Sequence, residues 1–221
     1  KPENIRDCEA LTARVGAQLG IAFDGDADRV VLVDEKGQAV ANDILTGVLA
    51  RSVLAREPGA GILYDVRSSR AIHELIVEHG GRPLRERVGH SFMKAALRKH
   101  AAAFGGELSG HYYFRDSYFA DSAMIAALMV IEAMDASNTP LSELAASVKR
   151  YAQSGEINFE VQDKHRALAR LLNHFSDAQV DRLDGVSVSY PDWWFNARPS
   201  NTEPLLRLNV EAGNEAELSK R

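Results

Sequence analysis

The sequence has little cysteine, no long apolar run and no surplus of basic charge. Cys8 is the only cysteine among 221 residues, so neither a disulfide within the chain nor a cysteine-based metal centre can form. The most apolar stretch, Ala123 to Ile131, is far shorter than the roughly 20 residues of a membrane-spanning helix. The net charge of −5 differs from the basic balance of most nucleic-acid-binding proteins. We therefore expect a cytoplasmic protein with no membrane or nucleic-acid partner.

Predicted helices and strands alternate up to about residue 151, and beyond it most of the predicted elements are strands. The first region predicts strands near 20–23, 30–33, 61–66, 84–88 and 103–107, and helices near 9–18, 43–56, 69–79, 91–100, 122–134 and 141–151. The second predicts strands at 156–161, 186–190, 193–198 and 205–211 and a helix at 163–175. Alternation favours a mostly parallel sheet. The predicted fold class is an α/β/α domain with a mixed sheet, followed by a smaller α+β domain.

Two further features of the sequence concern the start of one helix and the two ends of the chain. Ser91 is the expected N-cap of the helix near 91–100, because a serine hydroxyl can accept a hydrogen bond from the first turn. The chain begins with Lys1 rather than methionine, and residues 214–221 resemble a helix that has just begun. We expect a fragment of a longer protein.

The first polar loop follows the strand at 20–23 and holds carboxylates at alternate positions, Asp24, Asp26 and Asp28. Carboxylates with small residues between them can converge on one hard cation, and Mg²⁺ prefers a few such oxygens while leaving room for a phosphate oxygen. Arg29 comes next and suits a phosphate that bridges to the metal. The loop predicts a magnesium site, although a solvated acidic turn would have the same composition.

Two other metal-loop or phosphate-loop families have related spacing. A calcium EF-hand would use Glu35 at its twelfth position, but its sixth position requires glycine, and Arg29 stands there. A haloacid-dehalogenase-like phosphatase also places two aspartates after a strand, but it usually has threonine or valine where this chain has Asp28. Both patterns fit less well than a magnesium loop.

Two further loops carry groups suited to a sugar phosphate. In residues 105–111, Glu107 and Ser109 can project to the same side and bind adjacent hydroxyls, while His111 can donate or accept near neutral pH. In residues 198–204, an arginine fork and side-chain donors suggest an anion site. Its candidate residues are Arg198, Ser200, Asn201 and Thr202. An ordinary strand–helix turn and a polar hairpin are the alternative interpretations.

Together and in this order, the three loops resemble those of the α-D-phosphohexomutase family. The segments 23–29, 106–111 and 198–204 are similar to its metal, sugar-recognition and phosphate loops. The resemblance implies the end of the family's second domain at 1–38, its third, α/β domain at 39–151 and a truncated fourth, α+β domain at 152–221. The missing N-terminal domains of the same protein, which carry the phosphoserine, would be the chain's partners.

The resemblance also implies an activity, the interconversion of hexose 1-phosphate and hexose 6-phosphate through a bisphosphorylated sugar. Mg²⁺ would be bound by the three aspartates, and Arg29 would hold the transferring phosphate. Glu107 and Ser109 would bind the sugar hydroxyls, with His111 nearby. The second phosphate would be held by Arg198, Ser200, Asn201 and Thr202. The fragment itself is expected to be inactive because it lacks the serine.

Two further positions resemble the family less closely. Arg67 stands where a lysine usually follows Asp-Val, and a guanidinium is a poor general acid or base because it barely deprotonates. His90 lies in a Gly-His-Ser turn similar to the family's and is expected to reach the sugar or its phosphate, or else to make a structural hydrogen bond at a helix start. Both are retained as candidate catalytic residues.

The aromatic residues near the second and third loops favour the phosphomannomutase/phosphoglucomutase branch. They are Tyr112, Tyr113 and Phe114 in one segment and Trp193, Trp194 and Phe195 in the other. The expected substrates are mannose and glucose 1- and 6-phosphates. Phosphoglucosamine mutase, a non-catalytic sugar-phosphate-binding fragment and a metal-dependent phosphatase with Asp24 as its nucleophile remain as alternatives.

Overall fold

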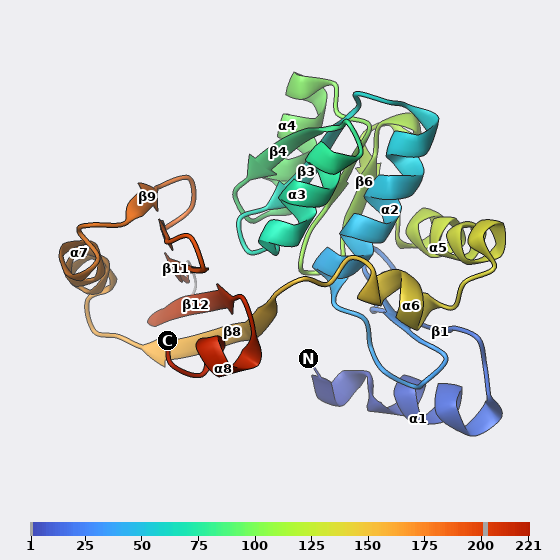
Figure 1. Ribbon diagram of the computed structural model, residues 1–221, viewed down its shortest axis with the longest axis horizontal. Coiled ribbons are helices and arrows are strands. Elements are labelled where there is room, and N and C mark those ends of the chain that lie inside the picture. The colour runs from blue at the N-terminus through green and yellow to red at the C-terminus, as the bar shows by residue number, and fades with distance from the viewer. Residues whose placement is uncertain (1, 201–202) are drawn as a thin grey trace. The chain divides into compact units, whose positions relative to one another are not determined.

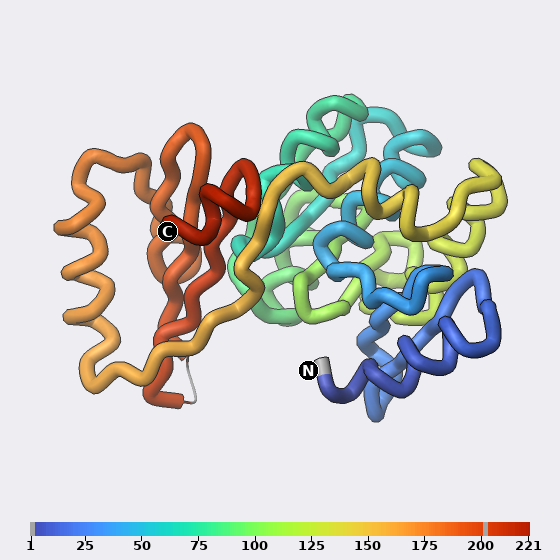
Figure 2. The backbone as a smooth tube through the Cα atoms, turned by 60° about the horizontal axis from the view of Figure 1, so that its bottom comes forward, coloured from blue at the N-terminus to red at the C-terminus, as the bar shows by residue number. Residues whose placement is uncertain are grey.

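The computed structural model describes residues 2–200 and 203–221 and divides the chain into two compact units. Unit 1 is Lys1–Lys149 and unit 2 is Arg150–Arg221. The chain passes from one to the other once, near residue 150 (Figure 2). None of the described helices combines the length and the apolar character that crossing a bilayer requires.

Unit 1 alternates helices and strands (Figure 1). Its helices are η1 Pro2–Asn4, α1 Arg6–Val15, α2 Asn42–Arg56, α3 Arg70–Glu78, α4 His90–His100, η2 Arg115–Ser117, α5 Ala123–Ser137 and α6 Leu141–Ala146. Its strands are β1 Gly20–Phe23, β2 Val30–Val33, β3 Gly61–Asp65, β4 Arg82–Glu86, β5 Phe104–Gly106, β6 Tyr112–Phe114 and β7 Ala120–Asp121.

The main sheet of unit 1 has the order β4-β3-β5-β6-β7. The β3–β4 and β3–β5 pairs are parallel, whereas β5–β6 and β6–β7 are antiparallel. Strand β3 is buried along its whole length, because Ile62 packs with α2, α3 and α5 on one face while Leu63 packs with α4 on the other. Burial on both faces explains its unbroken apolar run. The result is an α/β/α sandwich with a mixed sheet.

Strands β1 and β2 form a separate antiparallel hairpin, with Phe23 opposite Val30. This register leaves residues 24–29 as the turn. Val30 and Leu32 are buried in the same core as α2 and α5. The hairpin is therefore anchored to the sandwich by the second of its two strands.

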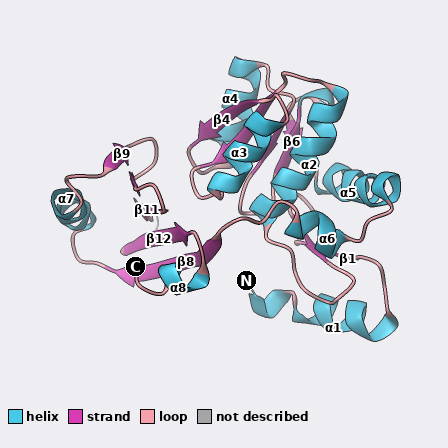
Figure 3. Ribbon diagram, viewed as in Figure 1, coloured by secondary structure: helices cyan, strands magenta, loops and turns pink. Residues whose placement is uncertain are grey.

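Unit 2 is dominated by one antiparallel sheet with the order β8-β12-β11-β10-β9. Strands are magenta in Figure 3. Its strands are β8 Ala152–Glu160, β9 Gln179–Asp181, β10 Val186–Ser189, β11 Trp193–Pro199 and β12 Leu205–Ala212. Its helices are α7 Lys164–His174 and the short α8 Glu215–Leu218. The core joins Val188, Phe195 and Val210 from the sheet to Leu168 and Leu171 of α7.

The predicted fold class is confirmed, and the differences lie in short elements and helix ends. Strands β6, β7 and β9 were not predicted. Helix α4 begins at His90, not after a Ser91 cap, because Gly89 has a φ of 130° and makes the turn into the helix with no side-chain cap. Helix α6 ends at Ala146 rather than at residue 151, since Val148 turns into the core and the chain then enters β8.

Gly106 ends β5 where the sheet meets α2. A β-carbon at Gly106 would lie 2.1 Å from Thr46 Oγ1 and 2.9 Å from Thr46 Cβ. We expect Gly106→Ala to lower the free energy of unfolding by about 1–3 kcal/mol, as overpacked sites do. Urea unfolding measures this, with Gly25→Ala as the control because a β-carbon there meets no atom within 4 Å. Equal stability of the two variants would contradict the close approach.

Candidate functional site

The turn of the β1–β2 hairpin brings its aspartates together. The Ala27 amide donates to Asp24 O at 3.2 Å and the Asp24 amide to Arg29 O at 3.3 Å, and Ala27 has a positive φ of 59°. Carboxylate oxygens of Asp24, Asp26 and Asp28 all lie within 4.8 Å of one another. A cluster of hard anionic oxygens fits Mg²⁺ better than a softer metal.

Arg29 holds one side of this turn. Its Nε lies 2.6 Å from Asp24 Oδ2 and 3.6 Å from Asp28 Oδ1, and its side chain is half exposed. Desolvation would raise the pKa of Asp24, but hydrogen bonds from the Arg29 amide and guanidinium outweigh it and lower that pKa. Asp24 is therefore ionised at neutral pH, as a metal ligand must be.

The loop between β5 and β6 is fixed from within and by two neighbouring elements. The Glu107 amide donates to His111 O at 2.9 Å, and the Gly110 amide donates to Glu107 O at 3.0 Å. Asn42 Nδ2 of α2 donates to Leu108 O at 3.2 Å, and the Val30 amide donates to Gly110 O at 3.2 Å. The last bond ties this loop to the hairpin that carries the aspartates.

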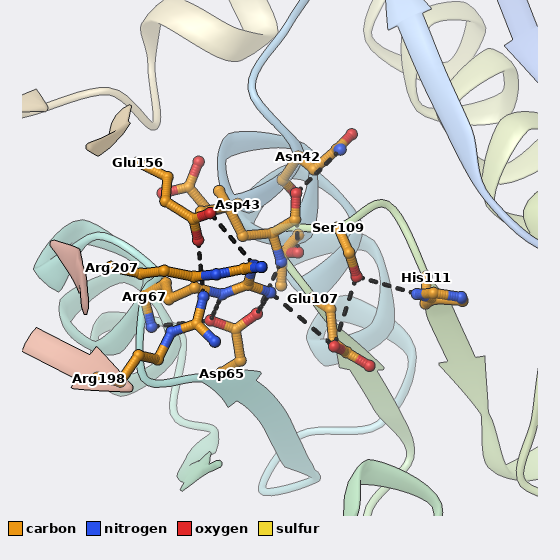
Figure 4. A network of polar contacts seen from close by, with 12 residues as sticks. Asn42, Asp43, Asp65, Arg67, Glu107, Ser109, His111, Glu156, Arg198 and Arg207 are labelled. Atoms are coloured by element: carbon orange, nitrogen blue, oxygen red, sulfur yellow. Dashed lines mark hydrogen bonds and ion pairs between the residues drawn. The ribbon is translucent and has the colours of Figure 1, made fainter. Parts of the chain in front are cut away.

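Glu107 is 2% exposed and lies among polar side chains of unit 1 (Figure 4). The Tyr113 hydroxyl donates to Glu107 Oε1, and Ser109 Oγ lies 3.4 Å from Glu107 Oε2. Burial, with the Glu107 carboxylate beside it, raises the pKa of Tyr113 well above its ordinary value. Tyr113 therefore stays protonated and donates to Glu107 throughout the neutral range.

An ion pair at the end of β3 lies beneath the same loop. Arg67 Nη2 is 2.6 Å from Asp65 Oδ2, and Arg67 Nε donates to Asp65 Oδ1 at 3.1 Å. Asp65 Oδ2 also accepts from the Leu108 amide at 2.9 Å, and Arg67 Nη2 lies 3.9 Å from Glu107 Oε2. Burial would raise the pKa of Asp65, but Arg67 and the amide hydrogen bonds lower it. Asp65 therefore connects the end of β3 to Arg67 and to the 107–111 loop.

His111 connects the loop to the aspartate turn. Its Nδ1 lies 2.9 Å from Ser109 Oγ and its Nε2 lies 3.3 Å from Asp28 Oδ2. The His90 ring, at the start of α4, has its centroid 6.3 Å from that of His111. These contacts therefore bring all nine predicted site residues of unit 1, from Asp24 to His111, into one region.

A lysine–aspartate pair borders this region. Lys94 Nζ of α4 lies 2.7 Å from Asp121 Oδ1 of β7, and Asp121 and His111 each place a ligand atom within 4.8 Å of Asp28. Desolvation opposes the shift, but the Lys94 hydrogen bond lowers the pKa of Asp121. The pair adds an anionic and a cationic group that the sequence patterns did not assign to the site.

In unit 2 the loop between β11 and β12 is closed at its base. The Ser200 amide donates to Leu205 O at 2.9 Å, and Ser200 Oγ accepts from the Glu203 amide at 3.3 Å. Lys164 Nζ, at the start of α7, donates to Ser200 O at 2.7 Å and to Glu203 O at 3.1 Å. Arg198 is buried at the end of β11. Asn201 and Thr202 lie outside the described residues.

Several polar residues at these sites were not predicted from the sequence. Asp65, Tyr113 and Asp121 lack a loop signature, because they lie in strands whose pattern indicates only burial. Glu156 and Arg207 also lie in strands, and Glu156 contacts both Arg198 and Arg207. The positions of these residues depend on the order of the strands in each sheet, and sequence patterns do not determine that order.

Comparison with known families matches both units. The model described as phosphoglucomutase/phosphomannomutase, alpha/beta/alpha domain III, matches residues 41–151. The model described as phosphoglucomutase/phosphomannomutase, C-terminal domain, matches residues 156–221. The two matches follow the two structural units in order.

Individual relatives agree. A phosphomannomutase of Methanocaldococcus jannaschii is 41% identical over 221 residues, covering 100% of this chain and 49% of its own length. The crystal structure of a phosphoglucomutase/phosphomannomutase family protein from Burkholderia thailandensis is 36% identical with a TM-score of 0.89, covering 100% of this chain and 48% of that one. This chain thus spans about half the length of these relatives.

A more distant structure shares the fold. It is an N-acetylphosphoglucosamine mutase of Aspergillus fumigatus, in complex with GlcNAc-6P and magnesium, which is 16% identical with a TM-score of 0.67. It covers 90% of this chain and 46% of that one.

The buried Asp65–Arg67 pair predicts a pH effect on stability. The pKa of Asp65 in the folded chain lies below its ordinary value of 3.8, so its contribution is complete above that value and is lost as the pH falls through the folded pKa. Asp65→Asn removes the carboxylate that Arg67 contacts at 2.6 Å and should cost about 3–5 kcal/mol at pH 7.

Urea unfolding from pH 7 down to pH 3 measures both effects. The native chain should lose stability in acid, and Asp65→Asn should lose less over the same interval. Asp116→Asn is the control, because the Asp116 side chain is 89% exposed. Identical acid profiles for the native chain and Asp65→Asn would contradict the assignment.

Proposed function

Because this chain belongs to the phosphoglucomutase/phosphomannomutase family, we propose that it forms the metal-, sugar- and phosphate-binding part of a phosphohexomutase. The observation that most supports this proposal is the contact between the aspartate turn and the 107–111 loop of unit 1. The Val30–Gly110 hydrogen bond and the Asp28–His111 contact place the aspartate turn beside the 107–111 loop. A metal-binding turn next to a hydroxyl-binding loop suits a phosphorylated sugar.

The proposed reaction transfers a phosphoryl group between the 1- and 6-positions of a hexose phosphate. The free sugar hydroxyl gives its proton to a base and forms a bond to the phosphorus of a phosphoserine, while the serine O–P bond breaks and the serine oxygen takes up a proton, which leaves a bisphosphorylated sugar. After the sugar has turned over, the other phosphoryl group passes to the serine oxygen in the same way, and the sugar oxygen that it leaves takes up a proton. We place that serine outside these 221 residues, so the chain taken alone binds the substrate without turning it over.

A cytoplasmic location, inferred from the sequence, stays a prediction.

The aspartate turn supports the metal part of this proposal. Asp24, Asp26 and Asp28 would hold Mg²⁺, which neutralises charge on a transferring phosphoryl group. Arg29 keeps Asp24 ionised and in place. Its half-exposed guanidinium also offers donors to a phosphate oxygen.

The loop after β5 supports sugar recognition. Glu107 and Ser109 present an acceptor and a hydroxyl close together, as two adjacent sugar hydroxyls require. Arg67 is placed as a positioning residue rather than an acid or base, because its guanidinium is engaged by Asp65 and stays protonated. His111 and His90 are the imidazoles of this region, and we propose that they handle protons at the sugar, because an imidazole nitrogen can donate or accept a proton.

The loop after β11 supports the second phosphate contact. Arg198 offers a planar fork, and Ser200 offers a hydroxyl at the loop base. Asn201 and Thr202 remain predicted contacts. The substrates we favour are the mannose and glucose 1- and 6-phosphates.

Calorimetric titration of the chain tests this recognition. In Mg²⁺ we expect mannose 6-phosphate and glucose 6-phosphate to bind, and Arg198→Ala to weaken binding about tenfold or more, because a charge-assisted contact is lost. Asp177→Ala, remote from the loop in sequence, is the control. Preference for glucosamine 6-phosphate would favour the phosphoglucosamine branch, and an aspartyl-phosphate on Asp24 would favour the phosphatase.

Removing one metal ligand tests the aspartate turn separately. Asp26 is exposed and is the turn carboxylate with no described ion pair to Arg29. We therefore expect Asp26→Asn to weaken Mg²⁺ binding about tenfold without disturbing the Arg29 contacts, whereas Asp116→Asn should change nothing. Unchanged Mg²⁺ affinity in Asp26→Asn would rule out the proposed ligand set.

A further inference from the structure

The first turn of α7 carries cations where a helix favours anions. It holds Lys164 and Arg166 and no acidic residue, although the N-terminal end of a helix has a partial positive charge that makes cations unfavourable there. The acidic residue at the N-cap, Asp163, uses its carboxylate to accept from the Arg166 amide at 2.9 Å. The stability of α7 therefore does not explain why a lysine stands at position 164.

The Lys164 ammonium binds the loop between β11 and β12 instead. Its Nζ donates to the Ser200 carbonyl oxygen at 2.7 Å and to the Glu203 carbonyl oxygen at 3.1 Å. Among the residues that the structure describes, no carboxylate forms an ion pair with Lys164. The Glu203 carboxylate contacts Arg207 Nη2 at 3.1 Å. One ammonium group therefore joins two backbone carbonyls of the loop.

A third carbonyl of this loop is bound by the same neighbouring segment. The Val161 amide donates to Pro204 O at 3.1 Å, and both Val161 and Lys164 belong to the segment that leads from β8 into α7. Carbonyl oxygens carry partial negative charge and would repel a phosphate, whereas backbone N–H groups attract one. Donors from residues 161–164 therefore occupy oxygens that would otherwise oppose an anion.

We propose that Lys164 is a positioning residue of the phosphate loop, which it serves by holding the Ser200 and Glu203 carbonyls rather than by touching the phosphate. This rests on the proposed phosphate contact of residues 198–204. It adds a residue from another element, α7, on which the affinity for the phosphate depends.

The energetic benefit comes from ordering the loop before the ligand arrives. Hydrogen bonds from a charged donor are about twice as strong as neutral ones, and both acceptors of Lys164 are main-chain oxygens, so these bonds hold the backbone itself. Ser200 is 5% exposed, which limits competition by water for its carbonyl. A loop that is already ordered loses less conformational entropy when it binds.

Calorimetric titration of the full chain with mannose 6-phosphate in Mg²⁺ measures the effect on affinity. Lys164→Met keeps the apolar stem but loses the donors, so we expect about tenfold weaker binding. Arg166→Met is the matched control, because it removes one positive charge from the same turn of an exposed residue and leaves the two carbonyl contacts in place. It should bind like the native chain. Lys164→Arg keeps a charged donor group and should restore most of the affinity.

Carbonyl ¹³C chemical shifts test the contacts themselves without ligand. The resonances of Ser200 and Glu203 should move in Lys164→Met and stay in place in Arg166→Met. Thermal unfolding verifies the fold of each variant. If Lys164→Met does not fold, the native chain provides the test, because Lys164 ¹⁵Nζ should show scalar coupling to both carbonyl carbons across the hydrogen bonds. Absence of that coupling would overturn the inference.

The affinities separate this inference from the proposed function. Native affinity in a folded Lys164→Met would mean that the lysine serves only the fold of unit 2, and equal weakening in Arg166→Met would assign the effect to charge alone. Either result would overturn the inference, while weaker binding in Arg198→Ala would leave the proposed phosphate contact standing. Failure of the native chain to bind mannose 6-phosphate would overturn both.

Discussion

The arrangement of unit 1 depends on one buried ion pair, between Asp65 and Arg67. Asp65 is fully buried and ends a strand that is buried on both faces, so its carboxylate requires full compensation. Arg67 and the Leu108 amide provide it. Because the same carboxylate binds both, the start of the 107–111 loop is fixed relative to β3, and Glu107 is held where Tyr113 can donate to it.

Two close backbone approaches connect the 107–111 loop to the aspartate turn. Gly106 lies against Thr46 of α2, and Gly110, with a φ of 94°, lies against Val30 O. Neither position has room for a β-carbon, which explains the two glycines that flank the loop. Through Val30 the loop meets the hairpin, so Asp28 and His111 come together from positions far apart in the sequence. The 107–111 loop and the aspartate turn thus share one structural support.

Most of this fold could be predicted from the sequence, because its helices, strands and turns have signals that span only a few residues. The apolar run of β3, the alternating helices and the aspartate turn each follow from periodicity or turn chemistry within a few residues. Strands β6 and β7 were missed because Tyr112–Phe114 and Ala120–Asp121 are too short to show a period. Asp65 and Glu156 could not be assigned partners, since their roles depend on which strands are neighbours. The prediction that Ser91 caps the helix was wrong, because the conformation of Gly89 decides where α4 begins.

Recognition of a hexose phosphate by this chain is tested most directly by mapping its amide chemical shifts as mannose 6-phosphate is added in Mg²⁺. We expect the largest shifts on residues 24–29 and 107–111 of unit 1 and on Arg198, Ser200 and Glu203 of unit 2. Shifts confined to residues outside these loops, or no shifts at saturating ligand, would contradict the claim that this chain recognises a hexose phosphate.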